Sequence, residues 1–162
     1  MSIFALTFPL LFIFHDMEEI IGMRSFITRN AEMLQRRFPF IYRQMCHSNT
    51  ETFAIGVMEE LVVFILIAIA ALYFDNTLCW NIWFGAFFGL AAHYVMHIGQ
   101  FIVIRKYIPA IITSVICLPI SVWILYRCYG LLEFNIWYAL IGLALAAVNA
   151  VVAVKMAWSG KR

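Results

Sequence analysis

The chain has 162 residues, of which 65% are apolar and only 12% are charged, and its mean hydropathy is +0.91. Soluble globular domains are close to half apolar and a quarter charged, so this composition excludes a water-soluble fold and predicts an integral membrane protein. The formal net charge is +2, and the basic residues are scattered between apolar runs, which excludes a nucleic-acid-binding face. The length predicts a single domain, residues 1–162.

A helix needs about 20 mostly apolar residues to cross the hydrocarbon core of a bilayer. Five stretches meet this requirement, so we predict an all-α bundle of about five transmembrane helices. The predicted spans are residues 3–23, 52–74, 82–104, 108–126 and 134–154. The first stretch has no basic leader and no small-residue cleavage site, which predicts a membrane helix rather than a signal peptide.

Ten of the 11 lysines and arginines lie in the connections after the first and third spans or near the C-terminus. The exception, Arg127, follows the fourth span. Because positively charged loops stay in the cytoplasm, we expect an outside N-terminus, a cytoplasmic C-terminus and a basic cytoplasmic loop at about residues 24–51. The expected location is the bacterial cytoplasmic (inner) membrane.

Within the basic loop, residues 31–38 combine helix-forming residues with Arg36 and Arg37. This pattern predicts a short helix on anionic headgroups, and a topology signal without a ligand is the alternative. His47, beside Cys46, is expected to be a solvated or interfacial residue. The four cysteines form no Cys-x-x-Cys pair and are predicted to be free.

Ionisable side chains inside a membrane are costly, so those within the predicted spans mark a candidate functional site. The spans contain His15, Asp16, Glu18, Glu19, Glu59, Glu60, His93 and His97. His15, Glu18 and Glu19 are spaced i, i+3, i+4, and His93 and His97 are spaced i, i+4, so each set projects from one helical face. Asp16 is expected to point away from its set, toward helix packing or the surroundings of the site.

These three sets lie at a common depth. At a rise of 1.5 Å per residue, each lies about 10 Å inside the cytoplasmic end of its predicted helix. Four carboxylates with almost no lysine or arginine beside them need another positive charge, because burial and mutual repulsion disfavour their ionised forms. A divalent metal supplies that charge. Imidazole with carboxylate is the ligand set of zinc, iron and manganese.

We therefore predict a metal site with one or two ions, with zinc favoured and an iron pair as the alternative. The predicted ligands are His15, Glu18, Glu19, Glu60, His93 and His97, and Glu59 is the predicted catalytic base. The spacing leaves open whether Glu18 or Glu19 is the ligand, because both face His15.

The functional prediction is a metal-dependent membrane enzyme, a hydrolase or a di-metal oxidoreductase. Membrane lipids surround it, and a lipid-like or small-molecule substrate is expected. Two alternatives use the same residues: a transporter of metal ions or protons, and a scaffold whose polar side chains only lock the helices together. The sequence specifies no oligomeric state.

The segment His15-Asp16-Met17-Glu18-Glu19 resembles the His-x-x-Glu-Glu signature of the HXXEE-domain family, whose function is unassigned. That family is also described by a further histidine, here His93 or His97, and by a Tyr-x-Pro-Gly motif. The segment 107–110, Tyr-Ile-Pro-Ala, is similar to this motif, with Ala110 at the glycine position. The alanine argues against a role that needs positive φ there. The resemblance implies an intramembrane polar site.

Overall fold

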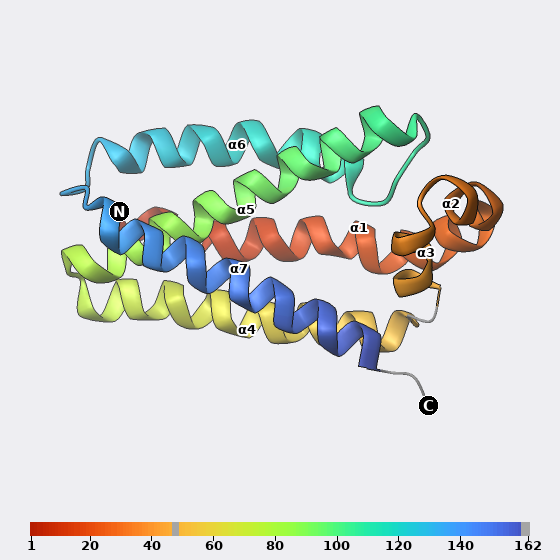
Figure 1. Ribbon diagram of the computed structural model, residues 1–162. Helices are drawn as coiled ribbons and strands as arrows, with labels where there is room; N and C mark the ends of the chain where they lie inside the picture. Colours follow the sequence, from red (N-terminus) through yellow and green to blue (C-terminus); the bar gives the residue numbers. More distant parts are fainter. Residues whose placement is uncertain (47–48, 160–162) are drawn as a thin grey trace.

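The computed structural model describes residues 1–46 and 49–159 and is helical throughout, with no strand in those ranges (Figure 1). The predicted all-α class is therefore confirmed, whereas His47 lies outside the described residues. A 3-10 helix, Ser2–Phe4, comes first. The α-helices are α1 (Thr7–Arg29), α2 (Ala31–Arg37), α3 (Pro39–Met45), α4 (Thr50–Phe74), α5 (Thr77–Ile104), α6 (Ile111–Tyr129) and α7 (Ile136–Ser159).

Four helices in the described ranges, α4, α5, α6 and the segment Ile136–Ala157 of α7, are long and apolar enough to cross a membrane. The chain is thus a membrane protein. The first of the five predicted spans also forms a helix, α1, but α1 is not among the four. Three carboxylates within four residues, Asp16, Glu18 and Glu19, separate its composition from that of the other long helices.

Asparagine side chains define where α4 and α5 begin. The Asn49 side chain accepts a hydrogen bond from the Thr52 backbone N–H at 2.7 Å, and the Asn76 side chain accepts one from the Cys79 N–H at 2.9 Å. Each bond satisfies a backbone donor that the first turn of a helix leaves unpaired. The short helix predicted at residues 31–38 is also present, as α2.

The long helices run between two ends of the molecule (Figure 1). One end, the α2–α3 end, carries α2, α3 and the connection between α5 and α6. The opposite end, the N-terminal end, carries the 3-10 helix and the α4–α5 and α6–α7 connections. Helix α7 packs against both α4 and α5, α6 packs against α5, and α1 packs against α4 and α6.

Glycines let α5 and α7 approach closely. A Cβ on Gly85 would collide with the Ala139 carbonyl, and a Cβ on Gly142 would collide with the Ile82 carbonyl. Small residues at a helix interface are how membrane helices gain packing energy, because lipid supplies no hydrophobic force between them. These contacts hold α5, the helix that carries two histidines, in a fixed position.

Aromatic side chains fill the interior toward the N-terminal end. The Phe8 ring lies 4.4 Å from the Phe64 ring and 5.4 Å from the Phe87 ring, measured between centroids. Trp83 packs edge-to-face against the Phe87 ring and donates its indole N–H to the Ala5 carbonyl at 3.0 Å. Farther along α1, α4 and α5 the interior becomes polar, and the candidate site begins there.

Candidate metal centre

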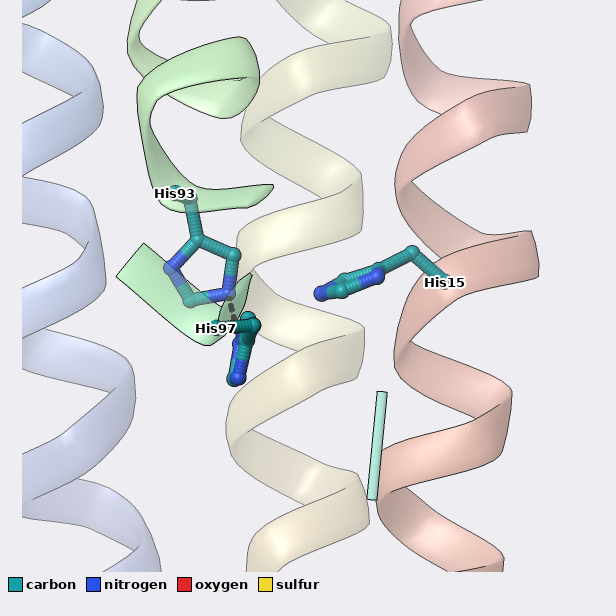
Figure 2. A group of neighbouring side chains, drawn as sticks. All are labelled: His15, His93 and His97. Atoms are coloured by element: carbon teal, nitrogen blue, oxygen red, sulfur yellow. Dashed lines mark hydrogen bonds between the residues drawn. The ribbon is translucent and has the colours of Figure 1, made fainter. Parts of the chain in front are cut away.

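Three histidines from two helices converge in the interior of the bundle (Figure 2). His15 comes from α1, and His93 and His97 come from successive turns of α5. The His15 ring centroid lies 5.3 Å from that of His93 and 5.0 Å from that of His97. One ring nitrogen from each of the three lies within 4.8 Å of the others.

The closest pair of nitrogens lies somewhat nearer than two nitrogens that bind one metal ion. His93 Nε2 and His97 Nε2 are 2.9 Å apart and share a hydrogen bond (Figure 2). Zinc binds histidine nitrogens at about 2.0–2.1 Å in a tetrahedral arrangement, which separates two ligating nitrogens by about 3.3 Å. Small rotations of these side chains would therefore give them the spacing of nitrogen ligands.

Two carboxylates adjoin the histidines. Ligand atoms of Asp16, Glu19 and His93 also lie within 4.8 Å of one another, and both acids are buried. Glu19 Oε1 is 3.6 Å from His97 Nε2. Asp16, expected to point away from the site, instead belongs to this second group. Helix α1 packs against α4 and α6, so residues about 100° apart on α1 can both face the interior.

The two consecutive glutamates of α4 have different surroundings. Glu60 lines a cavity of about 290 Å³ together with Asp16, Glu19 and His93. This places Glu60 beside the acids of α1, as the depth argument predicts. Glu59 lines neither this cavity nor a second one described below, and its Oε2 is buried without a hydrogen-bond partner among the described residues.

Glu18 faces α6 and is held there by three hydrogen bonds. Its Oε1 accepts from the Tyr107 hydroxyl at 2.6 Å, and its Oε2 accepts from the Thr113 backbone N–H at 2.8 Å and from the Thr113 hydroxyl at 2.7 Å. Of the two glutamates that spacing could not separate, Glu19 is the one that lies among the histidines. The bond to Glu18, with partial burial, raises the pKa of Tyr107 to about 12.

Thr113 connects Glu18 to His15. The Thr113 hydroxyl has one proton, and its acceptors are Glu18 Oε2 at 2.7 Å and, farther away, the Ala110 carbonyl at 3.2 Å. The hydroxyl oxygen lies 3.1 Å from His15 Nδ1, so it must accept a hydrogen bond from an Nδ1–H. This assignment leaves His15 Nε2 with a free lone pair. In metal sites, a histidine ligand is held in the same way by a hydrogen bond to its other nitrogen.

Several polar atoms of the group have no hydrogen-bond partner among the described residues. They include His15 Nε2, His97 Nδ1 and Asp16 Oδ2, all buried. An unsatisfied buried polar atom costs about 1–3 kcal/mol, so such atoms are rare in folded proteins. Two of them, His15 Nε2 and Asp16 Oδ2, belong to residues of the ligand groups and offer lone pairs, which favours a ligand that the group is built to hold.

The segment 107–110 positions the partners of Glu18. Ala110 is fully buried, has φ of 71° and is the residue immediately before α6. Positive φ therefore does occur at the position where the motif has glycine, although the alanine argued against it. The turn places the Tyr107 hydroxyl and the first turn of α6 against Glu18, where the helix dipole also favours a carboxylate.

A second cavity, of about 490 Å³, lies on the α2–α3 side of the group. It shares Glu19, Phe53, His93 and Val154 with the 290 Å³ cavity. The polar group therefore lies between two mostly apolar spaces. In the part of the chain that the structure describes, no lysine or arginine lines either cavity.

Comparison with known proteins adds a family but no activity. The sequence model of a family described as "protein of unknown function with HXXEE motif" matches residues 6–124. The chain belongs to the HXXEE family. No curated protein and no solved structure matches it. In this HXXEE protein the matched residues run from the start of α1 into α6 and include every candidate ligand.

The geometry explains the spacing of the HXXEE signature in this chain. His15 and Glu19, four residues apart, both reach the histidines of α5, whereas Glu18 reaches α6. Met17, between them, is 45% exposed on the outside of the bundle. Nothing in the order of the chain signals that the Thr113 hydroxyl joins Glu18 to His15, so sequence reasoning did not give it this role.

Proposed function

We propose that this HXXEE protein is an integral membrane metalloprotein. The metal would bind among His15, His93, His97, Asp16 and Glu19, with zinc favoured and one or two ions per chain, and Glu60 lines the cavity beside them. The observation that supports this most directly is the convergence of the two ligand groups, which share His93 and leave buried lone pairs without partners. In this proposal, Glu18 and Thr113 would hold His15 in the tautomer that offers Nε2 to the metal.

We further propose that the metal site is catalytic and acts on a lipid-like or membrane-proximal substrate. A bound zinc ion lowers the pKa of water and so supplies a nucleophile near neutral pH. Glu60 is the better-placed general base, because it lines the cavity beside Asp16 and Glu19, and Glu59 does not. An iron pair is the alternative, favoured by the carboxylates of the second group, and would give oxygen-dependent chemistry.

A transporter of metal ions or protons is the competing hypothesis. Transport needs polar side chains that continue through the membrane. In this bundle the space beyond the polar group is occupied by aromatic rings, among them Phe12 and Phe64 with centroids 4.8 Å apart. This packing favours a site that is reached from one side and therefore favours an enzyme.

Elemental analysis of the purified protein in detergent tests the metal. We expect one or two equivalents of zinc, or two of iron, per chain, removed by a chelator and restored by adding the ion. A metal content near zero, with no uptake of zinc, iron or manganese, would contradict the metalloprotein proposal.

A pair of neighbouring variants separates catalysis from transport. In proteoliposomes we expect no flux of protons or labelled metal, with or without Glu60→Gln. Once a turnover assay exists, Glu60→Gln should abolish turnover and Glu59→Gln should leave most of it. Metal flux that is lost in Glu60→Gln would favour the transporter.

The proposed location is the bacterial cytoplasmic membrane, with the α2–α3 end in the cytoplasm. Two partly exposed free cysteines, Cys46 and Cys79, lie at opposite ends of the bundle and report on this orientation. A membrane-impermeant maleimide should label Cys79 in intact cells and Cys46 only after permeabilisation. Cys79→Ser and Cys46→Ser identify each signal, and the reverse pattern would place the site at the outer side.

A further inference from the structure

We propose that the two cavities are the two halves of one binding site for the single hydrocarbon chain of an anionic amphiphile. The chain would enter at the α2–α3 end, pass Glu19 and His93, and end in the 290 Å³ cavity. The inference rests on the proposed function only in that it places the middle of the chain beside the metal. It names the substrate class for the iron-pair form of that site, since interior methylene groups carry no bond that a zinc-bound water could hydrolyse.

The walls of both cavities are apolar. The 490 Å³ cavity is lined by side chains such as Ile27 of α1, Leu34 of α2 and Ile104 of α5, and its polar lining among the described residues is Glu19, His93, His97 and Gln100. The 290 Å³ cavity continues with Phe12, Phe64 and Leu90, and its polar lining is Asp16, Glu19, Glu60 and His93. A hydrocarbon chain matches walls of this kind.

The shared residues place the polar group at the junction of the two cavities. Glu19 and His93 line both spaces, with Phe53 and Val154 beside them. A ligand with its polar head at the metal would use one cavity only. Two apolar spaces on either side of one polar junction instead favour a chain whose interior carbons lie at the junction.

The α2–α3 end supplies a place for the head group. Helix α2 turns Leu34, which is 2% exposed, toward the outer cavity, while Arg36 and Arg37 of the same helix are exposed. Arg105 and Lys106, at the end of α5, are exposed at the same end of the bundle. Basic side chains at a membrane surface attract anionic head groups, so a carboxylate or a phosphate fits here.

Two substitutions can fill the outer (490 Å³) and the inner (290 Å³) cavity separately. Gly99 lines the outer cavity at an exposed position, and a Cβ there would meet no atom within 4 Å, so Gly99→Phe adds a ring at the rim of this cavity without displacing the backbone. Ala150 of α7 lines the inner cavity, and Ala150→Phe fills that half. Ile102→Phe is the matched control, because Ile102 is 64% exposed on α5 and lines neither cavity.

The experiment measures the binding of radiolabelled octanoate and palmitate to the purified full chain, metal-free and zinc-loaded. We expect Gly99→Phe to weaken both by about tenfold or more, because the ring displaces methylene groups near the head. Ala150→Phe should weaken palmitate by about tenfold and leave octanoate within about twofold, since only the long chain reaches the inner cavity. Ile102→Phe should match the wild type.

The outcomes separate this inference from the metal proposal. An unchanged palmitate affinity in Ala150→Phe would overturn the inference, because the hydrocarbon chain would then be confined to the outer cavity. An equal loss of octanoate and palmitate binding in Ala150→Phe would also overturn it, if Ala147→Phe at the adjacent lining position gave the same result. Binding of palmitate with the expected variant effects, in a protein that takes up no metal, would support the inference and contradict the metal proposal.

Discussion

Two buried polar regions of this bundle differ in how their hydrogen bonds are used. Near the N-terminal end, Asn81 is fully buried, and its amide donates to the Thr77 and Glu133 carbonyls at 2.7 and 3.0 Å and accepts from the Asn135 N–H at 2.9 Å. Among the histidines, by contrast, His15 Nε2 and Asp16 Oδ2 have no partner in the described part of the chain.

The difference separates a structural polar residue from a candidate functional one. Asn81 joins the start of α5 to the connection that precedes α7, and its bonds satisfy the amide within the protein. The histidine and carboxylate group retains lone pairs that packing leaves unused. Burying polar atoms without partners destabilises the folded protein, and a ligand that binds these atoms stabilises it. The predictions below test this contrast, from the largest effect to the smallest.

The largest effect is expected for His93→Ala, because His93 belongs to both ligand groups. Metal content measured by elemental analysis should fall to background, and the stabilisation that added zinc gives to the wild type should vanish. Asn81→Ala is the control and should retain its metal. Wild-type metal content in His93→Ala would show that His93 is not a metal ligand and would contradict the proposed site.

Thr113→Val should weaken metal binding by about 10–100-fold, the usual loss when the hydrogen bond that orients a histidine ligand is removed. Thr113→Ser keeps the hydroxyl and should stay close to the wild type. The ¹⁵N shifts of His15 in the metal-free protein give a second measurement, since Thr113→Val should lose the preference for Nδ1–H. Equal affinities of the valine and serine variants would argue against this role.

Asn81→Ala should lower stability without affecting the metal. Removal of the amide leaves the Glu133 carbonyl and the Asn135 N–H without their partner, at a cost of about 1–3 kcal/mol. Thermal unfolding in detergent measures the loss, and elemental analysis in the same preparation checks the metal. A drop in metal content equal to that of His93→Ala would contradict the distinction between the two regions.

Ala110→Gly should stabilise the protein by about 1 kcal/mol, because φ of 71° is strained for alanine and relaxed for glycine. Metal affinity should stay unchanged, since the Tyr107 and Thr113 bonds to Glu18 keep their geometry. Thermal unfolding of the two forms provides the comparison, and lower stability of the glycine form would argue against the strain.

The smallest effect concerns pH. The pKa of Tyr107 is raised from 10.0 to about 12 by its bond to Glu18, so folding favours the neutral phenol. This contribution to stability is present below pH 10 and is lost as the pH rises toward 12. Tyrosinate absorbance should show a late titration that Tyr107→Phe removes, and an unchanged titration curve would argue against the bond.

Sequence reasoning identified most of the helices because hydropathy and length suffice for that purpose. The apolar stretches at residues 52–74, 82–104, 108–126 and 134–154 correspond to α4, α5, α6 and α7. Spacing and depth also predicted that His15, Glu19, Glu60, His93 and His97 would come together, because a helix has a fixed rise and period.

Only the tertiary structure decided how each helix is rotated about its axis and which rotamers its side chains adopt. That rotation turns Glu18 toward Tyr107 and Thr113 and brings Asp16 beside Glu19, although the sequence favoured another direction for Asp16. It also creates the two cavities and the positive φ of Ala110. Periodicity defines the faces of one helix, whereas the direction in which each face points depends on close packing against its neighbours.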